Sequence, residues 1–176
     1  MSVTDPKQSI SYTPIGVIRS IHVNPEQTPI QPVYSCGCTG TAEIFEQHCE
    51  GLSDLDGFSH IILIYHFHQA GPARMMVRPF LQDKLRGLFS TRAPNRPNSI
   101  GLSIVRLLSR EGPVLHLDCV DVLDGTPLLD IKPYVSRFDC IRETRCGWQD
   151  EVNEKEAQRR GLRGYLPGDV PEKGRP

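Results

Sequence analysis

Proline and glycine punctuate this sequence from end to end, and no other feature limits its possible folds as strongly. The 176 residues include 15 prolines and 15 glycines. Proline breaks helix interiors, and both residue types are poorly suited to the middle of a strand. We therefore expect short elements joined by many turns, and not a helical bundle. The length is that of one ordinary domain.

The apolar segments between the turns have the length and composition of β-strands. Segment 59–67 is the most apolar and predicts a central strand, and segment 114–123 carries apolar residues at odd and even positions, which predicts burial on both faces. Short strands at this spacing favour a mainly β fold, a small closed or nearly closed β-barrel. The predicted strands are 15–21, 41–45, 59–67, 99–108 and 114–123, with a shorter segment at 128–131.

The remaining segments are predicted to be loops and short helices. Residues 72–89 contain two prolines and no clear periodicity, which indicates a long loop. Residues 149–161 are polar and helix-prone, and residues 164–176 hold three prolines and three glycines, which predicts a disordered end. The expected division is therefore an N-terminal lead at 1–13, a barrel domain at 14–148, and a short polar helix with a flexible tail at 149–176.

Charge is segregated along the chain although the net charge is only -1. Residues 70–110 carry eight basic side chains and one acidic one, while 40–69 and 111–130 each carry five acidic side chains and no basic ones. Seven of the eight basic residues are arginines, whose guanidinium groups bind phosphates and carboxylates bidentately. The pattern suggests a nucleic-acid partner. A solvated face that pairs with the acidic segments explains it equally well.

Cysteine usage and hydropathy indicate an intracellular setting. No apolar window is long enough to cross a membrane and no secretory leader is visible, so we expect a cytoplasmic protein without a membrane partner. The six cysteines form no C-x-x-C pair, and reduced thiols are expected. Cys36 and Cys38 could join His66 or His68 at a metal, but zinc sites normally use two cysteine pairs or a cysteine pair with a spaced histidine pair. No metal site is predicted.

Common catalytic motifs are missing from the sequence. It contains no G-x-G-x-x-G, G-x-x-x-x-G-K-[ST], H-E-x-x-H or G-x-S-x-G motif. Dinucleotide binding, P-loop hydrolysis, zinc proteolysis and α/β-hydrolase chemistry therefore lack their usual support.

Two segments are richer in polar and charged residues than turns require. Segment 89–103 contains Arg92, Arg96 and Asn98, and Pro97 biases Arg96 toward an extended conformation, so the loop is rigid and presents polar groups. Segment 121–134 places Asp121, Asp124 and Asp130 between apolar residues. Asp124-Gly125 alone is an ordinary turn signal, but the recurrence of the acids is not explained by a turn.

Together with 57–60 (GFSH) and 67–69 (FHQ), these segments closely resemble the TrmO (TsaA-like) family of S-adenosylmethionine-dependent tRNA methyltransferases. The resemblance runs in order from Ile15 to Tyr134 and rests on TR, RPN and IG at 91–101 and on DGTP and DIKPY at 124–134. It implies a small, typically dimeric β-barrel that binds S-adenosylmethionine and methylates the exocyclic nitrogen of threonylcarbamoyladenosine beside the tRNA anticodon. Longer members continue into a further C-terminal domain, whereas about 40 residues follow Tyr134 here.

The resemblance also implies a set of cofactor-binding residues. Physical roles can be proposed beside it: Arg92 suits the cofactor carboxylate, Asp124 suits a ribose hydroxyl or the amino group, and Gly125 allows close backbone approach. The implied cofactor contacts are Gln31, Pro32, His68, Gln69, Arg92, Leu102, Asp124, Gly125, Thr126 and Pro127.

Methyl transfer to an amide-like nitrogen depends chiefly on the orientation of the two reactants. The nitrogen must also lose a proton, for which His68 and Asp121 are the candidate acceptors. His68 equally suits a role in orienting its loop, and His66 suits a structural role.

The substrate-binding candidates come from the basic segment. We expect Arg78 and Arg86 to contact tRNA phosphates, and Arg96 and Asn98 either to do the same or to hold their loop together. Two functions of other classes compete with a methyltransferase. The chain could be a non-catalytic S-adenosylmethionine-binding module, or an oligonucleotide-binding barrel, although only Phe80 and Phe89 would offer stacking platforms among the basic residues. A methyltransferase of the short form could also act on a substrate other than tRNA.

Overall fold

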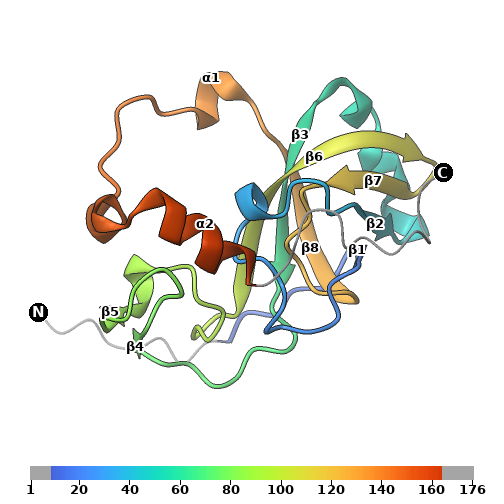
Figure 1. The fold of residues 1–176 in the computed structure, drawn as a ribbon. Helices are drawn as coiled ribbons and strands as arrows, with labels where there is room; N and C mark the ends of the chain where they lie inside the picture. The colour runs from blue at the N-terminus through green and yellow to red at the C-terminus, as the bar shows by residue number, and fades with distance from the viewer. Residues whose placement is uncertain (1–8, 164–176) are drawn as a thin grey trace, which may run out of the picture.

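The computed structural model describes residues 9–163 and contains a six-stranded closed β-barrel, with the helices α1 (Ser136–Asp139) and α2 (Glu154–Leu162) and a small hairpin to one side of it (Figure 1). Every pair of neighbouring strands is antiparallel. The predicted closed β-barrel is therefore confirmed. In barrel order, the strands are β1 (Gly16–Ser20), β2 (Gly40–Ile44), β7 (Val114–Asp118), β6 (Ile100–Glu111), β3 (His60–His66) and β8 (Thr126–Pro133).

Alternating side chains of the strands fill the barrel interior. In β6, burial alternates strictly from Ile100 to Leu107, so Val105 and Leu107 point inward while their neighbours are exposed. This period of two follows from the pleat of a strand. The core also receives residues from short helices and from the segment after β7. Its buried members include Ile18, Ala42, Ile44, Leu52, Leu55, Ile61, Leu63, Tyr65, Val105, Leu107, Leu115, Leu117, Val120, Val122 and Leu128.

Strand boundaries differ from the predicted ones around residue 119. The predicted strand 114–123 ends at Asp118, because Cys119 adopts a left-handed φ of 62° that interrupts the ladder. Burial differs between the two faces of β7: Leu115 and Leu117 are fully buried, whereas Val114, His116 and Asp118 are partly buried, so the expected burial of both faces holds in part. The short segment 128–131 extends to the eight-residue β8.

The predicted loop at 72–89 contains a small hairpin. Its strands are β4 (Met76–Val77) and β5 (Arg86–Gly87), each of two residues. The 3₁₀-helices are η1 (Pro32–Tyr34), η2 (Glu46–Leu52), η3 (Leu55–Gly57), η4 (Leu88–Ser90) and η5 (Gly147–Glu151), and the α-helices are α1 (Ser136–Asp139) and α2 (Glu154–Leu162). No helix within residues 9–163 is long and apolar enough to span a membrane.

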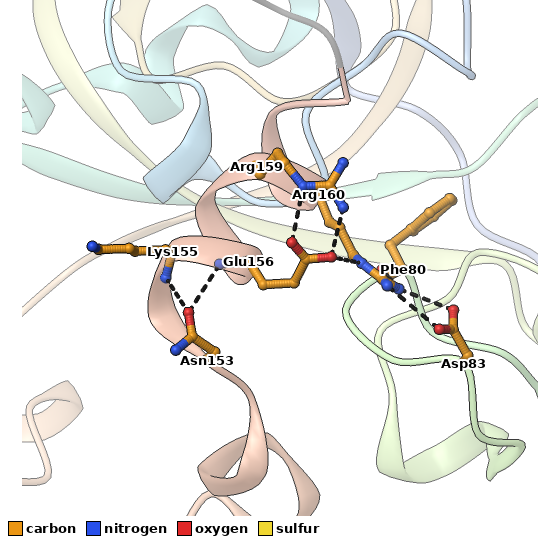
Figure 2. A network of polar contacts seen from close by, with 7 residues as sticks. All are labelled: Phe80, Asp83, Asn153, Lys155, Glu156, Arg159 and Arg160. Carbon is orange, nitrogen blue, oxygen red and sulfur yellow. Dashed lines mark hydrogen bonds and ion pairs between the residues drawn. The ribbon is translucent and has the colours of Figure 1, made fainter.

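Helix α2 begins later than the predicted 149–161 because Asn153 provides its N-cap. The Asn153 side chain accepts hydrogen bonds from the backbone N–H groups of Lys155 and Glu156 at 3.0 and 3.3 Å (Figure 2). The predicted helix is thus divided into η5 and α2. The predicted flexible tail at 164–176 lies outside the described residues.

Helix α2 bridges two loops that are far apart in sequence. Arg160 pairs with Asp83 at 3.0 Å and with Glu156 of its own helix at 2.5 Å, which ties α2 to the hairpin loop (Figure 2). On the other side, the Gly161 carbonyl accepts from the Ile30 N–H at 3.0 Å. A Cβ at position 161 would lie 2.6 Å from the Tyr34 ring, so glycine permits this close contact. The helix therefore fixes the loop at 21–39, which contains three prolines and is called the proline-rich loop below, relative to the loop at 67–99, called the basic loop because it carries most of the basic side chains of 70–110.

Candidate functional site

The predicted cofactor residues come from loops and strand ends at one end of the barrel. The C-terminal ends of β1, β3 and β7 meet the N-terminal ends of β2, β6 and β8 there, because neighbouring strands run antiparallel. The connecting segments are 21–39, 67–99 and 119–125. Barrel closure thus brings together three segments that are distant in sequence.

Arg92 and Gln31 form a direct contact between the basic loop and the proline-rich loop. Arg92 follows η4, where the Thr91 hydroxyl donates to the Leu88 carbonyl at 2.7 Å and fixes the backbone. The exposed guanidinium of Arg92 donates to Oε1 of Gln31, which is the N-cap residue of η1. An exposed cation is therefore held in place by a side chain 61 residues away, as an anion-binding arginine requires.

His68 lies just after β3 and contacts Thr126, the first residue of β8. The Thr126 hydroxyl donates to the Leu123 carbonyl at 2.7 Å, so its oxygen accepts from Nδ1 of His68 at 3.2 Å. With the proton assigned to Nδ1, Nε2 is the acceptor of the neutral ring. The Gln69 amide lies 3.4 Å from that nitrogen. His68 is exposed, so Nε2 can also accept a hydrogen bond from a bound molecule.

Asp121 ends a hydrogen-bonded chain that enters the barrel. Oδ1 of Asp121 accepts from the Ser103 hydroxyl at 2.6 Å, and the Tyr65 hydroxyl lies 3.0 Å from the same serine oxygen. Since the single Ser103 proton goes to Asp121, Tyr65 donates to Ser103. Asp121 as a whole keeps some exposed surface, but its carboxyl group is enclosed by protein atoms.

Burial raises the pKa of Asp121 to about 7, against the opposing effects of the Ser103 hydrogen bond and the nearby positive charge of Arg92. The carboxyl group is therefore present in both ionisation states near neutral pH, which suits a proton acceptor. Burial also raises the pKa of the Tyr65 phenol, with a further contribution from Asp121, so Tyr65 stays neutral.

The Asp124-Gly125 turn is fixed against β1. Oδ1 of Asp124 accepts from the Ser20 N–H at 3.1 Å, and its Oδ2 lies 3.9 Å from a guanidinium nitrogen of Arg19. Gly125 adopts a φ of +75°, and its N–H donates to the Ile18 carbonyl at 2.9 Å. The positive φ explains the glycine. Oδ2 of Asp124 remains able to accept a ligand hydroxyl.

The other predicted cofactor residues fall in two places. Pro32 starts η1 beside Gln31, and Pro127 follows Thr126 in β8 opposite Val17. Leu102 differs, because it lies on the outer face of β6 with 48% of its surface exposed. Its neighbours Gly101 and Ser103 face the interior. Leu102 therefore lies on the outside of the barrel, whereas the other predicted cofactor residues lie at its end.

The four predicted substrate-binding residues have different environments. Arg96 donates to the Thr91 carbonyl at 3.0 Å and lies over the Phe89 ring, which favours the loop-holding role. Arg86 donates to Gln82 at 2.6 Å, pairs with Glu151 at 3.4 Å and stacks on Trp148, so it too has structural contacts. Arg78 and Asn98 are exposed.

Three residues of the site were not predicted as functional from the sequence. Tyr65 and Ser103 carry the chain to Asp121, and both are polar groups at inward positions of apolar strands. That departure from the period-two pattern is the signal that could have identified them. Gly101 is required by packing, because a Cβ there would lie 2.2 Å from the Tyr65 ring.

Neither a metal-binding cluster nor the hollow at the other end of the barrel adds to this site in the described chain. Within residues 9–163, no three histidine, cysteine, aspartate or glutamate side chains converge as a metal centre would need. A hollow lined by Ile15, His48 and Asp130 lies at the opposite end of the barrel and contains none of the predicted residues.

Comparison with known proteins connects this geometry to a family. The family model for the tRNA-methyltransferase O N-terminal domain matches residues 17–140. The chain is 50% identical over 142 residues to a probable S-adenosyl-L-methionine-binding protein of Pyrococcus abyssi, covering 81% of this chain and 77% of that one. It is 37% identical over 133 residues to the human tRNA (adenine(37)-N6)-methyltransferase, covering 72% of this chain but 30% of the enzyme.

Solved structures agree with the sequence match. A crystal structure of TrmO superposes with a TM-score of 0.69 at 42% identity, over 80% of this chain and 64% of that one. TrmO from Pseudomonas aeruginosa gives a TM-score of 0.66 at 39% identity, over 80% and 62%. The chain thus spans less than two thirds of these TrmO chains. From the matching domain and the shared barrel, the chain belongs to the tRNA-methyltransferase O (TrmO) family.

Proposed function

We propose that this chain is an S-adenosylmethionine-dependent methyltransferase that methylates N6 of threonylcarbamoyladenosine beside the anticodon of tRNA. One observation carries the catalytic part of the proposal. Asp121 is an enclosed carboxyl group with a pKa near neutrality, joined to Tyr65 through Ser103 and close to the positive charge of Arg92. A binding module has no need of a proton acceptor that is costly to ionise.

The chemical groups at this end of the barrel fit the cofactor. When bound, S-adenosylmethionine supplies an electrophilic methyl group on a sulfonium. Arg92, steadied by Gln31, would bind its carboxylate, and Oδ2 of Asp124 would accept from a ribose hydroxyl. The walls of the cofactor site would be completed by Pro32, His68, Gln69 and the 125–127 segment. The open space around Gly125, where a Cβ would have its nearest neighbour 4.0 Å away, allows close approach.

Proton removal from N6 is assigned to Asp121, with His68 as the orienting residue. When cofactor and tRNA are bound, N6 would give up its proton as it accepts the methyl group, and the Asp121 carboxylate at this end of the barrel would take that proton. The Asp121 pKa of about 7 matches this task at neutral pH. His68 already uses Nδ1 to hold Thr126, and its Nε2 can accept a hydrogen bond from the substrate.

The basic loop is the proposed contact surface for tRNA. Arg74, Arg78 and Lys84 are exposed, and Phe89 is 73% exposed beside Arg96. Exposed cations neutralise phosphates, and an aromatic ring offers a base a stacking surface. The same loop carries Arg92, so bound RNA would lie next to the proposed cofactor site.

A homodimer is proposed through the outer face of β3 and β6. Ile100, Leu102 and Ile104 are 40%, 48% and 39% exposed on that face, and Ile62 and Ile64 of β3 lie directly opposite Ile104 and Leu102. Contiguous aliphatic side chains on a sheet surface indicate a protein contact. Dimer formation would also cover Leu102.

The test is methyl transfer from labelled S-adenosylmethionine to tRNA with and without the threonylcarbamoyl group. Transfer to the modified tRNA alone supports the proposal, and Asp121→Asn should lower the single-turnover rate roughly 100-fold. Asp130→Asn, in the outer part of β8, is the matched control and should retain the rate.

A non-catalytic binding module is the second candidate, because the Pyrococcus relative is named only for binding S-adenosyl-L-methionine. Cofactor binding without transfer to any tRNA would favour that module. Transfer to a different acceptor would favour a methyltransferase with a non-tRNA substrate.

A further inference from the structure

Two thiols that the proposed reaction does not use lie side by side on the surface. Sγ of Cys36 and Sγ of Cys119 are 3.4 Å apart, although the residues are separated by 83 positions. Cys36 follows η1 in the proline-rich loop, and Cys119 follows β7 directly. Cys36 is exposed and Cys119 is partly exposed, whereas Cys38 is buried.

The backbone on both sides holds the thiols in this position. Oδ1 of Asp118 accepts from the N–H groups of Gly37 and Cys119, at 2.9 and 2.7 Å. One residue further on, the Val120 N–H donates to the Cys38 carbonyl at 3.0 Å. Gly37 and Cys119 both have positive φ, 89° and 62°, so each segment turns sharply at the contact. The two thiols meet because both loops are pinned, not through chance side-chain overlap.

We propose that Cys36 and Cys119 form a dithiol oxidation site that a peroxide converts into an intrachain disulfide. The Cys36 sulfur attacks one peroxide oxygen, which gives a sulfenic acid and releases water. The Cys119 sulfur then displaces the sulfenic hydroxyl as a second water, and the S–S bond forms. The two thiols lose two electrons and two protons, and hydrogen peroxide becomes two waters.

The surroundings assign the order of the two steps. Cys36 is the more exposed thiol and is the first to meet an oxidant. Burial, the hydrogen bond with Cys36 and the Asp118 charge raise the pKa of Cys119 to about 12, so Cys119 stays a thiol near neutral pH. That state disfavours attack by Cys119 on peroxide, so Cys36 is oxidised first. Oxidation of Cys36 removes one of the contacts that hold the Cys119 proton, after which the Cys119 sulfur attacks the sulfenic acid.

Closing the bond requires little movement. A disulfide places its sulfurs about 2.05 Å apart, so the atoms must approach by about 1.4 Å, which rotation of the two side chains can provide. The bond would tie the proline-rich loop covalently to the end of β7. Because this loop carries Gln31, oxidation would keep the partner of Arg92 in place. The effect of oxidation on cofactor binding rests on the proposed function, whereas formation of the disulfide does not.

The experiment treats the reduced full-length protein with stoichiometric hydrogen peroxide and analyses it by mass spectrometry. We expect a loss of about 2 Da, a Cys36–Cys119 cross-linked peptide, and a rise in melting temperature of roughly 5–15 °C that dithiothreitol reverses. Cys36→Ser should abolish the cross-link, and Cys119→Ser should leave Cys36 as a trapped sulfenic acid. Cys140→Ser, which changes another exposed cysteine, should leave the Cys36–Cys119 cross-link intact.

Several results would overturn the proposal. They are a cross-link between other cysteines, direct over-oxidation of Cys36 in the wild type, or a cross-linked wild type that melts no higher than the reduced form. Calorimetric titration of both redox forms with S-adenosylmethionine separates the two proposals. If neither the reduced nor the oxidised protein binds S-adenosylmethionine, only the proposed cofactor site is refuted. If the cross-link does not form, only the proposed dithiol site is refuted.

Discussion

Replacing Asp121 with asparagine should make the stability of the variant rise relative to wild type as the pH increases through neutrality, while slowing the proposed reaction. The native pKa of Asp121 is about 7, raised by burial from an ordinary value of 3.8. Between these two pH values the native state holds a proton that the unfolded chain has lost. The stabilisation from this proton is complete below about pH 4 and is lost as the pH rises through about 7.

The magnitude follows from the size of the pKa difference. At 1.36 kcal/mol per pKa unit, the difference between about 7 and 3.8 corresponds to about 4 kcal/mol. The Asp121→Asn side chain has nearly the same shape, carries no charge at any pH, and can still accept the hydrogen bond from Ser103. The stability of the variant relative to wild type should therefore increase by about 4 kcal/mol between about pH 4 and pH 8.

Urea denaturation of both proteins at several pH values between about 4 and 8 measures this difference. Every other titrating group is shared by the two proteins, so its contribution cancels in the comparison. Asp130→Asn is the control, because its carboxylate is half-exposed and pairs with Lys132 at 2.7 Å. Parallel stability curves for wild type and Asp121→Asn would refute the assignment of a buried carboxyl with a raised pKa.

Three further predictions test packing, cofactor binding and RNA contact. Gly101→Ala should destabilise the barrel by about 1–3 kcal/mol, as in other overpacked cores, because the new Cβ would lie 2.2 Å from the Tyr65 ring. Thermal unfolding measures this loss, and an unchanged melting temperature would contradict it. Arg92→Ala should weaken S-adenosylmethionine binding by about 1.5–3 kcal/mol in calorimetric titration, and equal affinity would remove Arg92 from the site. Arg78→Glu should weaken tRNA binding and reduce its salt dependence while leaving cofactor affinity unchanged, which filter binding at several salt concentrations measures. Arg86→Glu should instead lower the melting temperature, because Arg86 contacts Gln82 and Glu151.

Several features of this fold can be predicted from local sequence. The continuous apolar run at 59–67 and the apolar segment at 99–108 indicate β3 and β6. The Asp124-Gly125 pair indicates the turn before β8, where Gly125 has the positive φ that glycine favours. The number of short strands favours a barrel. These predictions succeed because the signals depend on neighbours within a few positions.

Strand limits were predicted less well, because they depend on contacts beyond the segment. The ladder of β7 stops at Cys119, where Asp118 binds the backbone of the distant Gly37. The helix-prone run at 149–161 is interrupted where Asn153 caps α2. A tertiary contact therefore marks the end of β7, whereas the start of α2 is set by a local cap that the helix-prone composition of the run does not reveal.

The sequence by itself determined the chemical groups available to the candidate site, and the tertiary structure decided which of them act together. Arg92 meets Gln31 across 61 residues, and His68 meets Thr126 across 58. Asp121 is one acid among several in the sequence, and only enclosure at the barrel end beside Ser103 raises its pKa to about 7. The physical reason is that desolvation and hydrogen bonding depend on three-dimensional surroundings, which closure of the barrel creates.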